Sequence, residues 1–436
     1  MTYDHQRRTG RRLTATVTDL EVVRQKAFLI GVLLPDMDPA EAERSLDELA
    51  LLTDTANSDP VDMELVKRDA PDPAWYIGSG KASDLARLTK ALDIDVVVFD
   101  NPLSPAQQRN LHKVFECDVV DREALILDIF AQHATSGEGA LQVELALLRY
   151  RLPRLRGMGK MLSQQGAGIG TRGPGETKLE VDRRRIESRI SKLERQLKDL
   201  ARTRSTQRKS RRRANVPQAA LVGYTNAGKS TLLNRLTEAE VLTEDRLFST
   251  LDSTVRRLEL QSGRVMLLSD TVGFVRRLPH HLVEAFRSTL DDTKEADVLV
   301  HLVDASDPDP EGQIAAVREV LAEIEAIGIP EQIVFNKIDV ADPTAVARLR
   351  TLHPDALFIS ARTGAGVDLL LGAVEERLRS TTTLLHLDVP YTRADIIAAA
   401  HRLGEVVAEK HDDDSTILDV RLAARHLAQF QEFLVS

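Results

Sequence analysis

A glycine-rich octapeptide with one lysine and one serine stands near the middle of the chain. It reads Gly223-Tyr-Thr-Asn-Ala-Gly-Lys-Ser230 and fits the pattern G-x-x-x-x-G-K-[ST] in full. In this pattern backbone N–H groups cradle phosphates, the lysine reaches the β- and γ-phosphates, and the hydroxyl binds Mg²⁺. The sequence therefore predicts a phosphate-binding loop with Lys229 as its catalytic cation. Its members are Gly223, Tyr224, Thr225, Asn226, Ala227, Gly228, Lys229 and Ser230.

A second motif on the phosphate side follows an apolar stretch that predicts a strand over Val265–Ser269. Its members are Asp270, Thr271, Val272 and Gly273. We expect Asp270 to hold Mg²⁺ through water and the Gly273 N–H to contact the γ-phosphate.

A hydroxyl-rich stretch between these two motifs occupies the place of the first switch. One threonine there should complete the Mg²⁺ shell while a nucleoside triphosphate is bound. Thr250 is the first choice and Thr254 the alternative, so the predicted metal ligands are Ser230, Thr250 and Asp270. The stretch also supplies predicted phosphate-side residues: Phe248, Ser249, Thr250, Leu251 and Asp252.

Two later motifs predict which base is bound. In Asn336-Lys-Ile-Asp339, the Asp339 carboxylate can accept two hydrogen bonds from the guanine N1–H and exocyclic amine, which adenine cannot supply. After a predicted strand at Ala356–Ile359, a backbone N–H of Ser360-Ala361 should meet the guanine O6. The predicted guanine-binding residues are Asn336, Lys337, Ile338, Asp339, Ser360, Ala361 and Arg362. In this order the motifs indicate a GTPase that uses Mg²⁺.

Phe274 stands where many GTPases carry a glutamine that orients the attacking water. A phenyl ring cannot donate or accept such a hydrogen bond, so we expect slow intrinsic hydrolysis. A partner's group, a potassium ion or an ordered loop could replace the glutamine, and the sequence leaves these alternatives open.

The elements that must position these residues follow from the apolar pattern. Short apolar strands alternate with amphipathic helices at 1–139 and again at 214–381, which is typical of α/β domains and, in the second range, of a doubly wound parallel sheet. Strands are expected at Lys26–Leu34 and Asp95–Phe99, with helices at Pro39–Leu52 and Lys81–Leu92. The range 382–436 predicts a small C-terminal α/β domain with strands at its ends and a helix over Arg393–Lys410.

A basic helical hairpin is predicted over 140–213, between the first two of these domains. Two sets of apolar residues repeat at intervals of 4-3-4-3, as in the seam of a coiled coil: Leu141, Leu145, Leu148, Leu152 and Leu155, then Ile186, Ile190, Leu193, Leu197 and Leu200. The glycine-rich stretch Gln164–Gly175 separates the two helices as a flexible tip. The second helix is expected from Glu176 to about Arg204, about 40 Å long, followed by an Arg-rich tail.

Charge is segregated along the chain. Arg151–Arg213 holds 20 Lys/Arg against 6 Asp/Glu, a net of +14, within a chain whose net charge is −9. Such a continuous positive field predicts a polyanionic partner. Arg172 and Lys178 flank the tip and are candidates for contacts to this partner, whose identity the charge leaves open.

The remaining composition is that of a globular protein. No apolar stretch approaches the ~20 residues of a membrane helix, and a single cysteine excludes an intramolecular disulfide. We expect a cytoplasmic protein, and nothing requires more than a monomer. Gly78-Ser-Gly80-Lys81 matches a phosphate loop poorly and favours a turn before a helix over a second site, which leaves ATP at the N-terminal region as a weak alternative.

With these residues in place, the chain resembles the HflX family, bacterial GTPases that act on ribosomes. The resemblance spans nearly the whole chain, although Ser253 stands where a proline is expected. The marks are Gly170–Glu180 with Asp182–Arg184, Gly223–Ser230, Phe248–Asp252, Asp270–Phe274 and Asn336–Asp339. The resemblance implies binding to the large ribosomal subunit and the splitting or rescue of stalled, hibernating or stress-damaged ribosomes, with GTP hydrolysis stimulated by the ribosome. The hairpin tip would approach the peptidyl-transferase region, where Arg172 and Lys178 are candidates for contacts to RNA phosphates.

Two other functions compete with this one. A signalling switch with a protein effector would use the acidic remainder of the chain, but it gives no reason for the basic segment. An RNA-remodelling ATPase with a GTPase attached would need ATP turnover that survives loss of Lys229.

Overall fold

The computed structural model describes residues 16–18, 21–155, 178–213, 216–237, 247–248, 254–260, 262–276, 290, 293–380 and 382–435. The chain forms two compact units. The first consists of Met1–Leu197, Asp245–Ser249 and Pro279–Ala285, and the second of Lys198–Glu244, Thr250–Leu278 and Phe286–Ser436.

An all-parallel sheet with the strand order β4-β3-β5-β6 forms the core of the first unit. Its strands are β3 (Gln25–Leu33), β4 (Ser58–Lys67), β5 (Val96–Phe99) and β6 (Asp118–Asp121). The helices that connect and follow them are α1 (Pro39–Thr55), α2 (Ser79–Ala91), α3 (Pro105–Phe115) and α4 (Arg122–His133). A short antiparallel pair, β1 (Thr16–Thr18) and β2 (Glu21–Val23), precedes them. The predicted alternation of strands and helices is confirmed.

Apolar side chains bury one face of this sheet under α2 and α3. Phe28, Val97 and Phe99 of the strands pack with Leu85 of α2 and Leu111 of α3. Fully burying a side chain of this size contributes about 1.5–3 kcal/mol to stability. The apolar pattern that predicted these strands and helices therefore marks the side chains that hold the layer together.

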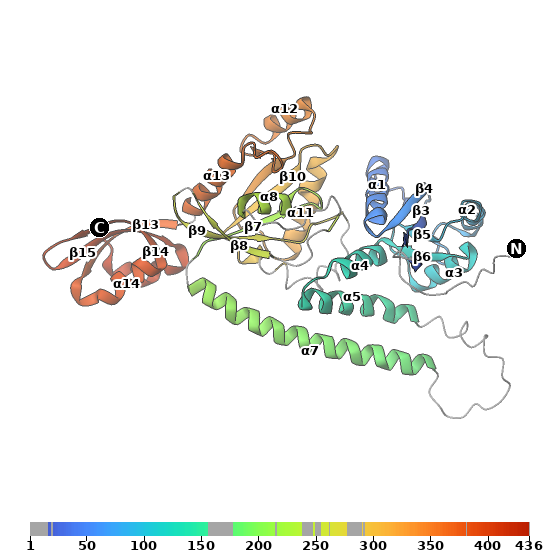
Figure 1. Ribbon diagram of the computed structural model, residues 1–436, viewed down its shortest axis with the longest axis horizontal. Coiled ribbons are helices and arrows are strands. Elements are labelled where there is room, and N and C mark those ends of the chain that lie inside the picture. The colour runs from blue at the N-terminus through green and yellow to red at the C-terminus, as the bar shows by residue number, and fades with distance from the viewer. Residues whose placement is uncertain are drawn as a thin grey trace. The chain divides into compact units, whose positions relative to one another are not determined.

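The hairpin consists of α5 (Gly137–Leu155) and α7 (Lys178–Arg213), which lie side by side in Figure 1. Two ion pairs join them, Glu144–Arg189 at 2.6 Å and Arg149–Glu194 at 2.9 Å. Of the predicted seam, Leu145 and Leu193 are buried. The prediction that the second helix ends near Arg204 is wrong, because the Arg-rich tail is helical to Arg213. Arg, Lys and Gln are good helix formers, and no Gly or Pro interrupts them.

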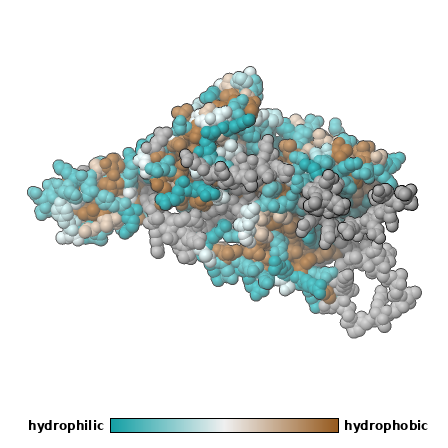
Figure 2. Space-filling view, in the orientation of Figure 1, coloured by the Kyte–Doolittle hydropathy of each residue, from teal (hydrophilic) through white to brown (hydrophobic). Residues whose placement is uncertain are grey.

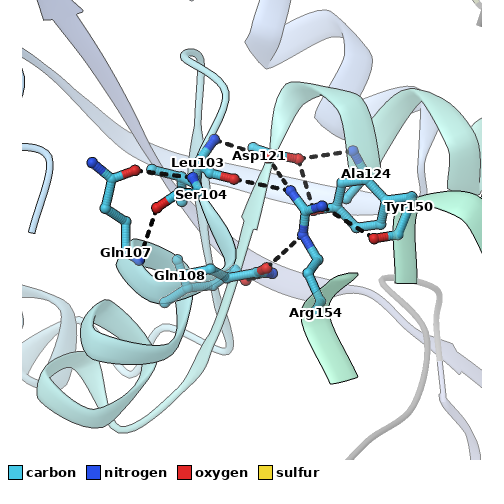
Figure 3. A network of polar contacts seen from close by, with 9 residues as sticks. Leu103, Ser104, Gln107, Gln108, Asp121, Ala124, Tyr150 and Arg154 are labelled. Carbon is cyan, nitrogen blue, oxygen red and sulfur yellow. Dashed lines mark hydrogen bonds and ion pairs between the residues drawn. The ribbon is translucent and has the colours of Figure 1, made fainter. Parts of the chain in front are cut away.

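A buried polar network ties the end of α5 to the sheet of the first unit (Figure 3). The Asp121 carboxylate at the end of β6 accepts hydrogen bonds from the Leu103 and Ala124 N–H groups, the Tyr150 hydroxyl and Arg154 Nη2, at 2.9–3.1 Å. The Arg154 guanidinium also lies 3.4 Å from the centre of the Tyr150 ring. Burial raises the pKa of Asp121, an effect that these donors oppose. The network holds α5 in its last turn.

A six-stranded sheet of order β12-β11-β10-β7-β9-β8 forms the core of the second unit, and all its pairs are parallel except β8 with β9. Its strands are β7 (Gln218–Gly223), β8 (Thr254–Glu259), β9 (Val265–Asp270), β10 (Val298–Asp304), β11 (Glu331–Asn336) and β12 (Leu357–Phe358). The described helices of this domain are α8 (Lys229–Thr237), α11 (Pro310–Glu323), α12 (Pro343–Leu352) and α13 (Val367–Ser380). This is the predicted doubly wound domain.

The C-terminal domain is a three-stranded antiparallel sheet of order β13-β15-β14 with one helix against it. The elements are β13 (Thr382–Pro390), α14 (Ala394–Leu403), β14 (Gly404–His411) and β15 (Ser415–Ala423), with 3-10 turns at Tyr391–Arg393, Ala424–Gln429 and Gln431–Phe433. The helix predicted over Arg393–Lys410 is therefore wrong in its second half. Gly404 ends α14, and the residues after it pair with β15 instead.

None of the helices in the described ranges combines the length and apolar character needed to cross a membrane. On the face drawn in Figure 2, apolar and hydrophilic residues are interspersed. Apolar side chains such as Ile327 and Leu369 are exposed, as some apolar side chains are in most globular proteins.

Candidate nucleotide-binding site

The predicted phosphate loop connects β7 to α8, at the carboxyl end of a central strand. The Lys229 side chain is buried, and its Nζ donates to the carbonyl oxygens of Gly223 (3.0 Å) and Tyr224 (2.7 Å). Burial lowers the pKa of Lys229 to about 8, and the nearby Asp270 carboxylate opposes the shift. The loop thus holds one buried ammonium group where a phosphate chain would lie.

Ser230 and Asp270 come together as the sequence predicted. Ser230 Oγ donates to Asp270 Oδ2 at 2.8 Å, although the two residues are 40 positions apart. A hydroxyl and a carboxylate oxygen are ligands that suit Mg²⁺, so this pair fits the expected metal. Thr254, the alternative threonine, begins β8 and is paired directly with Asp270 across the sheet.

The Asp270–Gly273 motif continues β9 along the phosphate loop. Thr271 is fully buried, and its hydroxyl donates to the Leu221 carbonyl at 2.7 Å. A Cβ on Gly273 would lie 2.8 Å from Thr225 Cγ2 and 3.1 Å from Lys229 Nζ. Only a residue without a side chain can approach the loop this closely, which explains the glycine and places its backbone beside Lys229.

Phe274 extends this contact through its backbone. Its N–H donates to the Gly223 carbonyl (3.2 Å), and its carbonyl accepts from the Thr225 N–H (2.7 Å). The ring is 1 % exposed. Next to it, the Arg276 N–H donates to the Tyr224 hydroxyl at 2.6 Å, and the Arg276 guanidinium pairs with Asp309 at 2.6 Å. A segment that should respond to the γ-phosphate is therefore hydrogen-bonded to the phosphate loop itself.

Asn336 joins the phosphate half of the site to the base half. Its Nδ2 donates to the Ala227 carbonyl, and its Oδ1 accepts from the Ala361 N–H, both at 2.8 Å. At Gly228, with φ +91°, any side chain would collide with Asn336 Nδ2. The Ala361 N–H, one of those expected to meet guanine O6, is thus already held by Asn336 in this structure.

The other predicted base-side residues gather around Asn336. Lys337, with φ +64°, pairs through Nζ with Asp304 Oδ2 at 2.8 Å. Ile338 donates its N–H to the Ile359 carbonyl at 3.3 Å. Asp339 is exposed, whereas Ser360 is fully buried and accepts from the Thr363 N–H at 3.0 Å. Arg362 is exposed. Val272, which was predicted on the phosphate side, is buried.

Two residues outside the predicted set, Asp304 and Asp309, also position this site. Asp304 pairs with Lys337, and Asp309 with Arg276. Asp304 is the last residue of β10, so its place at the carboxyl end of a parallel strand was a usable signal. No comparable signal in the sequence marked Asp309, because its partner Arg276 lies 33 residues away.

The remaining predicted residues have other contacts, are exposed, or are not described. Phe248 belongs to the first unit, where its ring lies 4.6 Å from that of Phe130 in an edge-to-face contact. Asn226, with φ +58°, is exposed at the apex of the loop. Ser249, Thr250, Leu251, Asp252 and Arg172 lie outside the described residues, as does the side chain of Lys178.

The weak phosphate-loop match in the N-terminal domain forms the start of a helix. Gly78 is the N-cap residue of α2, and Lys81 is paired with Glu64. This arrangement supports the interpretation as a turn before a helix.

The fold and the site together define a P-loop protein with the parts of a guanine-nucleotide site. Three stretches of the chain match described families: GTP-binding GTPase N-terminal at residues 43–131, GTP-binding GTPase Middle Region at 133–211, and 50S ribosome-binding GTPase at 218–337.

Two proteins similar to this chain over most of its length are both named GTPase HflX. GTPase HflX of Lacrimispora saccharolytica is 44% identical over 418 residues, covering 95% of this chain and 97% of its own. GTPase HflX of Escherichia coli is 43% identical over 380 residues, covering 86% and 89%. A solved GTP-binding protein of Sulfolobus solfataricus in complex with GDP has a TM-score of 0.43 and 24% identity, covering 81% of this chain and 98% of its own. The chain belongs to the HflX family of GTPases, and it is a GTP hydrolase. The resemblance found in the sequence is confirmed.

Proposed function

We propose that this GTPase binds the large ribosomal subunit, splits or rescues stalled or hibernating ribosomes, and hydrolyses GTP in response to the ribosome. The observation that carries the proposal is the basic hairpin. Residues 151–213 have a net charge of +14, from 20 Lys/Arg and 6 Asp/Glu, in a chain of net −9.

The helix α7 presents much of this charge to solvent. It has 36 residues, about 54 Å at ~1.5 Å per residue, and Arg185, Lys192, Arg195 and Lys198 are among its exposed side chains. A long, narrow and basic element suits a deep crevice in RNA, where phosphate contacts supply most of the affinity. The match of residues 218–337 to the 50S ribosome-binding GTPase family supports the same partner.

In this proposal GTP lies along the loop from Gly223 to Ser230. Lys229 would hold the β- and γ-phosphates, and Asp339 and the 360–362 loop would hold the guanine. Ser230, with Asp270 acting through water and Thr250 from the first switch, would hold Mg²⁺. When bound, Mg²⁺ neutralises charge on the phosphate oxygens.

Because Phe274 replaces the catalytic glutamine, the ribosome would be needed to stimulate hydrolysis. Its buried ring cannot orient water, and its backbone is hydrogen-bonded to the phosphate loop. Intrinsic turnover should therefore be slow, and a partner that moves this segment would stimulate it. Partner stimulation is worth about 10³–10⁵-fold in other GTPases.

The test compares GTP turnover by the full chain alone, with bare ribosomal RNA, and with large ribosomal subunits. We expect strong stimulation by large subunits and little by RNA. A Lys229→Ala variant is the control, because it should abolish turnover under every condition.

Other outcomes would redirect the assignment. Equal turnover with and without large subunits would remove the ribosome as activator and favour a protein effector. ATP turnover that persists in Lys229→Ala would favour a second nucleotide site.

A further inference from the structure

Arg235 lies in the last turn of α8, the short helix that begins with Lys229 and Ser230. No nucleotide-binding motif includes this position. Its guanidinium reaches across the domain to the loop after β12: Nε donates to the Ala361 carbonyl at 2.5 Å, and Nη2 donates to the Arg362 carbonyl. These residues are 126 and 127 positions away in the chain.

The peptide unit of Ala361 is therefore held from both sides. Asn336 Oδ1 accepts from its N–H at 2.8 Å, and Arg235 donates to its carbonyl oxygen. The side chain of Ala361 is buried, so the residue has little freedom to move without losing these contacts.

The loop is shaped to receive the guanidinium. Gly364 has φ +92°, and a Cβ there would lie 2.8 Å from Arg235 Nη1. The turn is closed by hydrogen bonds from the Gly364 N–H to the Ser360 carbonyl (2.8 Å) and from the Ser360 N–H to the Ala365 carbonyl (2.9 Å). A planar fork that binds two successive carbonyl groups fixes orientation as well as distance.

We propose that Arg235 is a positioning residue for guanine selectivity, which couples the phosphate end of the site to the loop at the guanine O6. One helix carries the phosphate-side Lys229 at its start and holds the base-side loop near its end. Arg235 acts through the backbone of Ala361 and Arg362 and does not touch the nucleotide. The inference rests on the assignment of residues 360–362 to the guanine edge and is independent of the ribosome as partner.

The test measures the equilibrium affinity of the full chain for three nucleotides. GDP carries O6, N1–H and the 2-amino group; IDP lacks only the 2-amino group, and 2-aminopurine riboside diphosphate lacks both O6 and N1–H. In Arg235→Ala, the affinities for GDP and IDP should fall together by roughly tenfold, about the worth of one charged hydrogen bond. The affinity for the 2-aminopurine analogue should change little, so discrimination between GDP and this analogue should fall by the same factor.

Two further variants separate positioning from general damage. Arg235→Lys, which can reach one carbonyl, should be intermediate. Arg318→Ala is the matched control, because Arg318 makes two hydrogen bonds to Glu331 in the same domain and contacts no nucleotide motif; it should leave the discrimination as in the wild type.

Two results would overturn the proposal. Unchanged discrimination in Arg235→Ala, with equal losses for all three nucleotides or none, would mean that Arg235 serves stability alone. A wild-type chain that binds GDP and the 2-aminopurine analogue equally would instead remove the assignment of the 360–362 loop to O6, whatever the ribosome does to turnover.

Discussion

The Lys229 side chain shows how one buried charge can prepare a site for its ligand. Its ammonium group donates hydrogen bonds to the carbonyl oxygens of Gly223 and Tyr224 in the phosphate loop, and the residue is 6 % exposed. Burial disfavours the charged form and lowers its pKa to about 8, while Asp270 acts in the opposite direction. The negative phosphates of GTP or GDP should favour the charged form and raise this pKa again.

Nucleotide affinity should therefore depend on pH above neutrality. The free protein loses the Lys229 proton as pH rises through about 8, whereas the complex retains it. Binding then takes up a proton, and affinity should fall by up to about tenfold per pH unit above that pKa. Calorimetry of GDP binding in buffers of different ionisation enthalpy would measure the uptake. Lys229→Arg, which stays charged, should bind without this pH dependence, and a flat profile in the wild type would contradict the prediction.

At the scale of the element, the end of α5 is attached to the first unit through one carboxylate. The four hydrogen bonds that Asp121 accepts come from the β5–α3 connection, α4 and α5. Arg154 strengthens the attachment with hydrogen bonds to Gln108 and the Leu103 carbonyl, each at 2.9 Å. The glycine-rich stretch begins at Gln164, ten residues after Arg154 in the sequence, so the network holds the helix that precedes this stretch.

Asp121→Asn should destabilise the first unit by about 1–3 kcal/mol, because the amide replaces one acceptor oxygen with an NH2 donor that faces groups that are themselves donors. Hydrogen exchange should show lost protection in the last two turns of α5, with GDP affinity unchanged. Arg149→Met, which removes the more exposed pair with Glu194, is the matched control and should cost less than about 1 kcal/mol. Normal protection of α5 in Asp121→Asn would show that other contacts hold the helix.

At the scale of the whole molecule, charge is divided between a basic segment and an acidic remainder. The segment 151–213 carries +14, against −9 for the chain. Such a division lets the chain approach a polyanion with one segment while the rest resists nonspecific binding. With the large ribosomal subunit as the proposed partner, it also predicts that the affinity depends strongly on salt.

Replacing Arg172 and Lys178 by Ala should weaken binding to large ribosomal subunits and flatten its salt dependence. Each lost phosphate contact should reduce the slope of log affinity against log salt by about 1. Lys67 and Arg348 are exposed and lie outside the basic segment, so the Lys67→Ala, Arg348→Ala double variant is the control for the same loss of charge. Equal slopes in both double variants would mean that the tip does not contact the large ribosomal subunit.

The sequence determined the parts of this protein that depend on local spacing. Some elements could be predicted because they depend on contacts between residues that are close in the sequence. These are the phosphate loop, the strands that end at Asp270 and Asn336, and the two helices of the hairpin. Steric and hydrogen-bonding preferences act over that distance, and the chemistry of phosphate and guanine binding requires fixed intervals.

The tertiary structure decided what joins these parts. Residues 404–411 form a strand because β15 offers them hydrogen bonds, although the sequence pattern favoured a helix. Arg235 meets Ala361 across 126 residues, and Asp121 meets Arg154 across 33. No local preference specifies such pairs, because they form only when the packing of the sheets and helices has brought distant segments together.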